Sequence, residues 1–282
     1  MRVIEPFIYA TFKVCEYSLY EILNIINMKN SDDVRVDGKI ALITGAARGI
    51  GRACALALAE AGADIALGLR DIKKDDGVVK EIQAMGRKAL PLQMDVSKMD
   101  EIAAAFKKIK MHYNRLDILI NNAGVAPENL VENVTEKDFD YTIDVNLKGT
   151  FFVSQLAGKM MIQQKFGRII NLSSQAGFVA LPGESVYCMT KAGIAHLTKC
   201  LAAEWGRYNI NVNAVAPTFI YTPGTEEYLS DEDAKQHVLS KIILNRIGEP
   251  KDVANAVLFL SSPAASSITG TTLLIDGGWT AL

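Results

Sequence analysis

The chain has 282 residues, of which 49% are hydrophobic and 22% are charged. This composition excludes a globally disordered, collagen-like or coiled-coil protein and allows one large α/β domain or two small domains. The 30 basic and 32 acidic side chains leave a formal net charge of -2. So balanced a charge is not typical of proteins that bind nucleic acid or an anionic membrane, and we expect neither partner.

The cysteines and histidines are too few and too scattered to suggest a metal centre. The four cysteines show no CxxC pairing, and the three histidines show neither HxxH nor HxxxH spacing. A zinc site would therefore need carboxylates for most of its ligands, and we expect no metal. Sparse, unpaired cysteines are typical of proteins in a reducing compartment, so we expect a cytoplasmic protein without structural disulfides.

Residues 1–36 differ in character from the rest and are treated as an N-terminal extension to a domain spanning residues 37–282. Charged residues interrupt their apolar runs before these reach the ~20 residues of a membrane span, and they also disrupt a signal-peptide core. Two interpretations stay open. Residues 17–28 form a short amphipathic helix that docks on the body or on a partner subunit, or translation begins at Met28.

From Lys39 onward, short apolar runs alternate with helical patterns. Strands are expected at residues 40–44, 64–69, 89–94, 116–120, 168–172, 211–215 and 272–275. Helices are expected at residues 50–61, 77–85, 98–111, 135–145 (with Thr135 as its cap), 186–205 and 250–260. Fully apolar strands separated by helices predict a parallel sheet covered on both faces, and the uninterrupted alternation predicts a single doubly wound α/β domain.

A glycine-rich turn, TGAARGIG at residues 44–51, follows the first expected strand. Its three glycines permit a tight turn and a close approach to a ligand, and the next helix would direct its free N–H groups and positive dipole end at a pyrophosphate. The spacing is GxxxGxG rather than GxGxxG, so the turn alone could be an ordinary strand–helix connection.

Tyr187 and Lys191 lie four residues apart in the longest expected helix and so share one face. A nearby ammonium favours the phenolate and lowers the pKa of a tyrosine, which suits it for proton exchange with an alcohol. Ser173 and Ser174 follow the expected strand at residues 168–172, at the sheet edge where α/β proteins bind ligands. A serine hydroxyl there can donate to a developing alkoxide.

Several motifs in order resemble the short-chain dehydrogenase/reductase family over residues 36–282. They are TGAARGIG at 44–51, NNAG at 121–124, VN at 145–146, SSQAG at 173–177, YCMTK at 187–191 and ITGTTLLIDGG at 268–278. The resemblance implies a Rossmann-type fold with a mostly seven-stranded parallel sheet and a nicotinamide cofactor.

The resemblance also implies the catalytic roles. Tyr187 is the expected general acid/base, and Lys191 is expected to lower the pKa of Tyr187 and to bind the nicotinamide ribose. Ser174, thirteen residues before Tyr187, is expected to hold the substrate oxygen, with Ser173 the weaker choice. Asn146 matches the residue that holds a water in the proton relay. Gln175 is expected to bind a substrate hydroxyl together with Ser174 and Tyr187.

The remaining cofactor contacts follow from the same resemblance. Besides Tyr187 and Lys191, they are Gly45, Arg48, Gly49, Ile50, Gly51, Arg70, Asp95, Val96, Asn121, Ala123, Gly124, Pro217, Ile220 and Thr222. Asp95 and Val96 correspond to an adenine-edge contact. Asn121 serves either the adenosine ribose or the cohesion of the sheet. Thr218 stands where the family commonly has glycine, which predicts a stiffer loop at residues 217–222.

The second strand indicates which nicotinamide is bound. Leu69 stands where the family places a carboxylate that bonds the ribose hydroxyls and repels a 2′-phosphate. Arg70 follows it, and Arg48 lies in the glycine-rich turn, so two guanidinium groups can bind a 2′-phosphate. We therefore favour NADP over NAD, although Asp71 could pair with Arg70 and weaken this preference.

The expected function is NAD(P)-dependent hydride transfer to or from a small secondary alcohol or ketone. An acidic segment at residues 222–241 and similarity to sugar and polyol dehydrogenases favour a sugar or polyol. The alternatives are a 3-oxoacyl-carrier-protein reductase, which would need a basic docking patch, and a catalytically silent dinucleotide-binding scaffold. The long helix at 186–205 and the C-terminal strand are expected to form the interfaces of a homotetramer, as is usual in the family.

Overall fold

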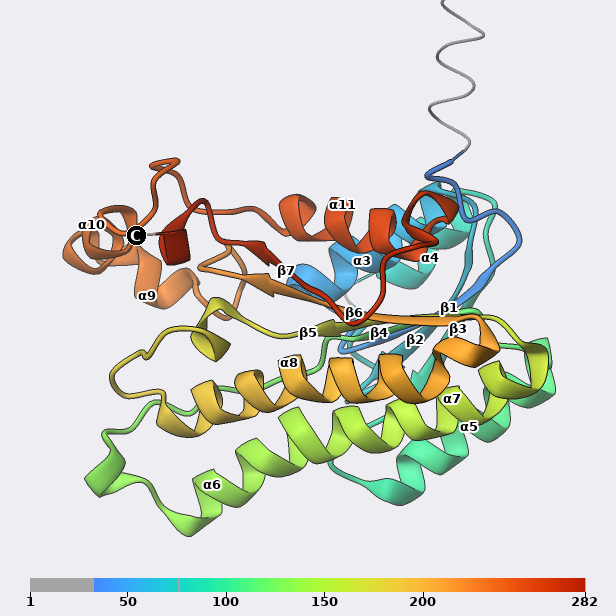
Figure 1. Ribbon diagram of the computed structural model, residues 1–282, viewed down its shortest axis with the longest axis horizontal. Helices are drawn as coiled ribbons and strands as arrows, with labels where there is room; N and C mark the ends of the chain where they lie inside the picture. The colour runs from blue at the N-terminus through green and yellow to red at the C-terminus, as the bar shows by residue number, and fades with distance from the viewer. Residues whose placement is uncertain (1–32, 76, 282) are drawn as a thin grey trace, which may run out of the picture.

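The computed structural model describes residues 33–75 and 77–281, so the two interpretations of residues 17–28 and Met28 lie outside the described residues. Seven parallel strands form one sheet in the order β3-β2-β1-β4-β5-β6-β7 (Figure 1). The strands are β1 (Ile40–Thr44), β2 (Asp64–Leu69), β3 (Ala89–Gln93), β4 (Ile118–Asn121), β5 (Gly167–Leu172), β6 (Ile210–Pro217) and β7 (Thr272–Ile275). The predicted α/β class and all seven strands are confirmed.

Helices cover both faces of the sheet (Figure 1). One layer contains α3 (Gly49–Glu60), α4 (Val78–Ala84) and α11 (Pro250–Ser261), and the other contains α5 (Met99–Tyr113), α7 (Thr150–Gln164) and α8 (Ser185–Trp205). The strand order reverses direction at β1 and β4, which is where open α/β sheets bind ligands. None of the helices in the described part of the chain is long and apolar enough to cross a bilayer.

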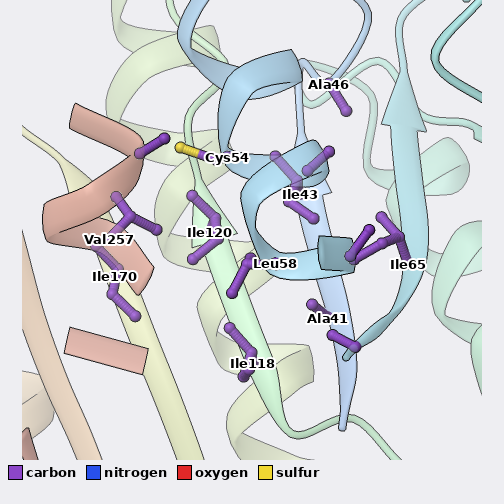
Figure 2. Close-up of a cluster of buried hydrophobic side chains, with 14 of the residues drawn as sticks. Ala41, Ile43, Ala46, Cys54, Leu58, Ile65, Ile118, Ile120, Ile170 and Val257 are labelled. Carbon is purple, nitrogen blue, oxygen red and sulfur yellow. The ribbon is translucent and has the colours of Figure 1, made fainter. Parts of the chain in front are cut away.

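The two hydrophobic cores arise from the alternation of side chains along each strand. Ala41 and Ile43 of β1 enter the core beneath α3 and α11, whereas Ile40 and Leu42 enter the core beneath α5 and α7. Figure 2 shows Leu58 of α3 pointing into the first core. A side chain of this size, fully buried, contributes about 1.5–3 kcal/mol. Burial on both faces explains why the strands are apolar at nearly every position.

The helical region before β5 is longer than predicted. Thr135 caps α6 (Glu136–Thr142) as expected, its Oγ1 accepting a hydrogen bond of 3.1 Å from the N–H of Asp138. The chain then continues through a π-helical segment, Ile143–Gly149, directly into α7, for which the sequence analysis had no helix. No capping residue marks the start of α7, and its polar and apolar residues do not separate onto two faces. The periodicity of hydrophobic residues therefore did not indicate a helix here. The wide π turn contains Asn146, and such turns are frequent at functional sites.

Candidate active site

The glycine-rich turn between β1 and α3 is shaped for close contact with a ligand. Gly45 and Gly49 have φ values of +66° and +56°, which side chains rarely adopt. A Cβ on Gly51 would overlap the carbonyl oxygen of Gly45 and the amide nitrogen of Asn122. The predicted Gly45, Gly49 and Gly51 are thus required by the local geometry, and Ile50 lies between them in the first turn of α3.

The N-terminus of α3 presents free backbone donors. Arg48 stands at its N-cap in an extended conformation with no side-chain cap, and the first turn carries no acidic residue. The first N–H groups of a helix have no partner within the helix and favour an anion. Thr222 packs against this turn, its Cβ 3.4 Å from where a Cβ of Gly49 would lie. The residues present therefore fit a pyrophosphate between the turn and the loop that contains Ile220 and Thr222.

Asn122 fixes the turn from the end of β4, a role that the sequence analysis missed. Its Nδ2 donates to the carbonyl oxygens of Thr44 (2.9 Å) and Gly45 (3.1 Å). The N–H groups of Asn122 and Ala123 both donate to Thr44 Oγ1 at 3.0 Å. The NNAG motif pointed to this place, but only the contacts distinguish the role of its second asparagine from that of its first.

Asn121 lies in the core, where its side chain contacts groups of the protein. Its side chain is buried, and its Nδ2 donates to Asn171 Oδ1 and to Ser154 Oγ, both at 2.8 Å. Asn171 continues this polar chain to Thr198 Oγ1 of α8 at 2.9 Å. Of the two roles considered, the cohesion of the sheet with α7 and α8 is the one that the contacts fit.

The loops after β2 and β3 are joined by a polar network that the sequence did not indicate. Gln93 Nε2 donates to the carbonyl oxygen of Arg70 (2.8 Å) and to Glu101 Oε2 (2.9 Å). Glu101 Oε2 also accepts the N–H of Asp95 at 2.8 Å, and these bonds hold the pKa of Glu101 below its ordinary value against the effect of burial. Val96 is buried next to Asp95. Hydrogen bonds therefore connect Arg70 and Asp95, two of the predicted cofactor contacts, at the carboxyl ends of β2 and β3.

Arg70 follows the end of β2 and Arg48 stands at the start of α3, whereas an apolar residue occupies the position of the ribose-binding carboxylate. The Leu69 side chain is buried in the core. Asp71 accepts a hydrogen bond from the N–H of Lys73 (3.0 Å) and lies 4.0 Å from Lys74, not against Arg70. Among the residues that the structure describes, neither Arg48 nor Arg70 forms an ion pair. The pairing of Asp71 with Arg70 that would have weakened the NADP preference is not observed.

Ser174 is the serine that faces Tyr187. Its hydroxyl forms a hydrogen bond with the Tyr187 phenol, accepts the N–H of Ala176 at 3.1 Å and lies 3.4 Å from the carbonyl oxygen of Pro217. The neighbouring Ser173 donates its hydroxyl to the backbone oxygen of Lys191 at 2.9 Å and is buried. Ser173 thus ties β5 to α8, while Ser174 can reach a substrate.

Tyr187 and Lys191 lie close together, but their pKa values differ from the prediction. Lys191 Nζ is 5.4 Å from the centre of the Tyr187 ring and donates to the carbonyl oxygen of Leu172 at 2.7 Å. Burial lowers the pKa of Lys191 to about 8. Burial also raises the pKa of Tyr187 to about 12, and the hydrogen bond from Ser174 opposes this rise. Desolvation is the largest influence on the Tyr187 pKa in this structure, and the lowering by Lys191 that the family resemblance implies stays a prediction.

Asn146 is anchored behind the lysine by the backbone of the β4–α6 loop. Its Oδ1 accepts the N–H of Val125 and its Nδ2 donates to the Val125 carbonyl oxygen, both at 2.8 Å, with a third bond of 3.2 Å to Thr190 Oγ1. A Cβ on Gly124 would lie 3.4 Å from Asn146 Oδ1 and 3.7 Å from Lys191 Nζ. Gly124, Asn146 and Lys191 therefore lie close together, and their catalytic and cofactor-binding roles stay predictions.

Gln175 joins two loops beside Ser174. Gln175 is only 1% exposed, and its Oε1 accepts the hydroxyl of Thr218 at 2.8 Å, so its predicted contact with substrate is not supported. Instead it links the β5–α8 loop to the loop at 217–222, at the position where threonine replaces the usual glycine. The stiffness predicted for that loop has this hydrogen bond as its physical basis.

Glu184 is an acidic neighbour of Tyr187 that the sequence analysis did not identify. It is half-buried immediately before α8, and burial raises the pKa of its carboxyl, with the charge of Glu128 adding to the rise. Glu128 packs on this loop, its Cγ 3.1 Å from the Cβ position of Gly183. The Glu184 charge in turn raises the Tyr187 pKa. The Tyr187 phenol is therefore influenced by the hydroxyl of Ser174 and by the carboxyl of Glu184, which shift its pKa in opposite directions.

Comparison with known proteins agrees with this geometry. A family model described as enoyl-(acyl carrier protein) reductase matches residues 45–280. The chain is 43% identical over 247 residues to a 3-oxoacyl-(acyl-carrier-protein) reductase of Thermotoga maritima, covering 87% of this chain and 99% of that protein. It is 42% identical over 253 residues to an NAD-dependent glycerol dehydrogenase of Listeria innocua, covering 88% and 96% respectively.

Among solved structures, a gluconate 5-dehydrogenase from Burkholderia cenocepacia in complex with NADP and tartrate superposes with a TM-score of 0.86. The two are 33% identical, and the match covers 90% of this chain and 99% of the other. The family model spans well over half of the chain, and the curated relatives match it over nearly their full length. The chain therefore belongs to the short-chain dehydrogenase/reductase family and is an NAD(P)-dependent oxidoreductase that acts on CH–OH and ketone groups.

Proposed function

We propose that this enzyme interconverts the secondary alcohol and ketone of a neutral, polyhydroxylated small molecule, a sugar or polyol, with NADP preferred over NAD. The observation that carries the proposal is the surroundings of the Tyr187 phenol. The phenol forms a hydrogen bond with Ser174, and the charge of Glu184 acts on it. A substrate hydroxyl or carbonyl placed here meets two hydroxyl donors. Further hydroxyls of the same molecule have a carboxylate nearby to accept their hydrogen bonds.

The proton chemistry is assigned to Tyr187 and Ser174. The bound nicotinamide supplies or accepts the hydride. In reduction, the Tyr187 phenol donates its proton to the substrate oxygen while the Ser174 hydroxyl donates a hydrogen bond to it and stabilises the developing negative charge. In oxidation, the phenolate accepts the alcohol proton. A pKa of about 12 keeps the phenol protonated near neutral pH, which favours the reductive direction there.

Lys191 and Asn146 are proposed to support this proton transfer. The Lys191 ammonium lies behind the phenol and can donate to ribose hydroxyls as well as to the Leu172 carbonyl oxygen. Asn146 is proposed to orient a water near Lys191 Nζ, so that protons pass from Tyr187 toward solvent. The two hydrogen bonds that fix Asn146 to the Val125 backbone support this role, because a proton relay needs its donor and acceptor groups held at fixed positions.

The charges around the site support a neutral substrate. Glu184 acts on the Tyr187 phenol and has Glu128 near it, and residues 222–241, which include α9 (Glu226–Ser230) and α10 (Glu232–Leu239), carry five acidic residues and two lysines. Negative charge of this kind repels phosphorylated and carboxylated molecules and also an acidic carrier protein. The glycerol dehydrogenase of Listeria innocua is a relative named for a neutral polyol.

The NADP preference is supported by Arg48 and Arg70. Both are exposed and have no carboxylate partner among the described residues, and the position that would carry a ribose-binding acid is the buried Leu69. Guanidinium groups bind phosphate through paired hydrogen bonds. The gluconate 5-dehydrogenase of Burkholderia cenocepacia was solved with NADP.

We also propose that the protein is a cytoplasmic homotetramer. Exposed apolar side chains gather on two separate faces. One face includes Phe151 of α7 and Met189 of α8, and the other includes Leu273 and Leu274 of β7. Burial of both faces against other copies of the chain would give two interfaces, as a tetramer requires. Leu201 and Ala202 of α8, by contrast, belong to the core.

The test is a steady-state survey at 340 nm with sugars, polyols and their ketones, each with NADP(H) and NAD(H). We expect turnover of neutral polyhydroxylated substrates, and a higher kcat/KM with NADPH than with NADH. Arg70→Ala should raise the KM for NADPH far more than that for NADH, with Arg207→Ala, at the opposite end of the strands, as the matched control.

The 3-oxoacyl-carrier-protein reductase remains the second candidate, because relatives of this chain at 43% identity carry that name. The survey therefore includes acetoacetyl thioesters. Turnover of thioesters without turnover of any polyol would favour that activity. Tight cofactor binding without turnover of any substrate would favour a silent scaffold instead.

A further inference from the structure

Tyr141 of α6 lies across from Arg70, although the two residues are far apart in the sequence. Arg70 Nη1 donates to the Tyr141 hydroxyl oxygen at 3.5 Å, which is the one hydrogen bond of the Arg70 guanidinium within the described chain. Tyr141 is 40% exposed and so lies at the surface of the protein. The contact joins the loop after β2 to the helix that follows β4.

The helix that carries Tyr141 faces the predicted adenosine edge. Tyr141, Val145 and Gly149 recur every four residues along the continuous α6 and π-helical segment. Gly149 packs so closely on Val96 that a Cβ there would lie 2.7 Å from the Val96 carbonyl oxygen, and Val145 is buried in the same core as Val96. The row of residues that begins with Tyr141 therefore lies against the loop after β3.

The opposite side of this edge is held in place by the network already described. The Arg70 backbone is bound through Gln93 and Glu101 to Asp95, so the loops after β2 and β3 form one rigid unit. Arg70, Asp95 and Tyr141 thus enclose a single strip of surface at the carboxyl ends of β2 and β3. A ligand on this strip contacts Arg70 from one side and Tyr141 from the other.

The hydrogen-bond chemistry indicates an anionic ligand. A guanidinium has no acceptor, so in the Arg70–Tyr141 contact the phenol oxygen accepts and its own proton stays available. A phosphate near both groups would receive hydrogen bonds from the guanidinium and from the phenol together. Asp71 is turned back to Lys73 and Lys74, which leaves the positive charge of Arg70 uncompensated.

We propose that Tyr141 is a specificity-determining residue that holds the Arg70 guanidinium in position and donates its own hydroxyl proton to the 2′-phosphate of NADP. This inference rests on the proposed NADP preference and adds a second donor to it. Tyr141 takes no part in hydride or proton transfer, so its effect is confined to the affinity and selectivity for the phosphorylated cofactor.

The test compares Tyr141→Phe, which removes only the hydroxyl, with the matched control Tyr208→Phe, whose ring lies beneath Arg207 at the amino end of β6. Calorimetric titration measures the Kd of NADPH, NADH and adenosine 2′,5′-bisphosphate. Loss of a hydrogen bond to a charged group should raise the Kd of NADPH and of the bisphosphate about tenfold in Tyr141→Phe. The Kd of NADH should change by no more than about twofold. Tyr208→Phe should change none of the three.

A double-mutant cycle then tests the coupling with Arg70. Because both side chains hold one phosphate, Tyr141→Phe should weaken NADPH binding less in an Arg70→Ala background than in the wild type. Unchanged NADPH affinity in Tyr141→Phe, or equal weakening of NADPH and NADH, would overturn the Tyr141 proposal while leaving the NADP preference intact. Wild-type protein that binds NADPH no more tightly than NADH would overturn both.

Discussion

The side chain of Asn146 binds both backbone groups of Val125, accepting the N–H and donating to the carbonyl oxygen at 2.8 Å each. The two residues are 21 positions apart, and the pairing makes the π-helical segment a support for the loop after β4. This loop carries Gly124, which faces Lys191. The geometry of the loop beside Lys191 thus depends on one side-chain amide.

Replacement of Asn146 by aspartate should therefore act through this pairing and depend on pH. A carboxylate can accept the Val125 N–H but cannot donate to its carbonyl oxygen, so two acceptors then face each other. We expect a loss of about 1–3 kcal/mol in the free energy of unfolding at neutral pH, with partial recovery at lower pH as the carboxyl protonates. Chemical denaturation at several pH values measures this, with Asn255→Asp on the exposed side of α11 as the control. A uniform loss at all pH values would contradict the pairing argument.

Gly51 is predicted to tolerate no side chain. In Gly51→Ala the new Cβ would overlap the Gly45 carbonyl oxygen and Asn122 Nδ2, so the glycine-rich turn must move away from β4. We expect cofactor affinity to fall by at least about tenfold, with a loss of stability of about 1–3 kcal/mol as in overpacked cores.

Gly206→Ala is the matched control for this variant. Gly206 has no atom within 4 Å of its Cβ position and lacks the positive φ of the turn glycines. Fluorescence titration with NADPH and thermal unfolding would compare the two variants. Equal behaviour of Gly51→Ala and Gly206→Ala would show that the turn has room that its contacts do not indicate.

The raised pKa of Tyr187 predicts opposite pH behaviour for the two reaction directions. The phenol is protonated well below its pKa of about 12, so reduction should change little between pH 6 and 8, while oxidation should accelerate as the phenolate fraction grows with pH. The charge of Glu184 raises this pKa, so Glu184→Gln should shift the oxidation profile to lower pH. Glu204→Gln, at the far end of α8, should leave it in place. An unshifted profile in Glu184→Gln would disprove the influence of Glu184 on the phenol.

Lys191 predicts a stability that changes with pH. Burial lowers its pKa from 10.5 in the unfolded chain to about 8 in the folded protein. Between these values the unfolded state binds more protons, so this group makes the folded protein more stable as the pH rises. Relative to Lys191→Met, the wild type should gain about 2 kcal/mol in the free energy of unfolding between pH 7.5 and 9.5.

Lys191→Met also loses the hydrogen bond from Lys191 to the Leu172 carbonyl oxygen. This loss makes the free energies of unfolding of the wild type and the variant differ by an amount that does not vary with pH. The slope, and not the offset, is therefore the diagnostic quantity in urea titrations across this range. Parallel curves for the two proteins would mean that Lys191 keeps its ordinary pKa in the folded state.

The amino-acid sequence by itself determined the strands and most of the helices, and it supplied the motifs of the candidate site. Strands buried on both faces require apolar residues at successive positions, so β1 and β2 could be located to the residue. The glycines at 45, 49 and 51 and the spacing of Tyr187 and Lys191 are likewise local features. They reflect backbone and helix geometry that a short segment specifies alone.

Tertiary structure decided what depends on distant neighbours. Asn121 and Gln175 are polar residues at the ends of strands, where a ligand contact was the natural expectation, yet Asn171 and Thr218 engage them inside the fold. The Tyr187 pKa likewise follows mainly from burial, with smaller effects from Ser174 and Glu184, which the spacing of Tyr187 and Lys191 did not indicate. Orientation and desolvation are properties of the assembled protein, because both depend on which segments come to surround a side chain.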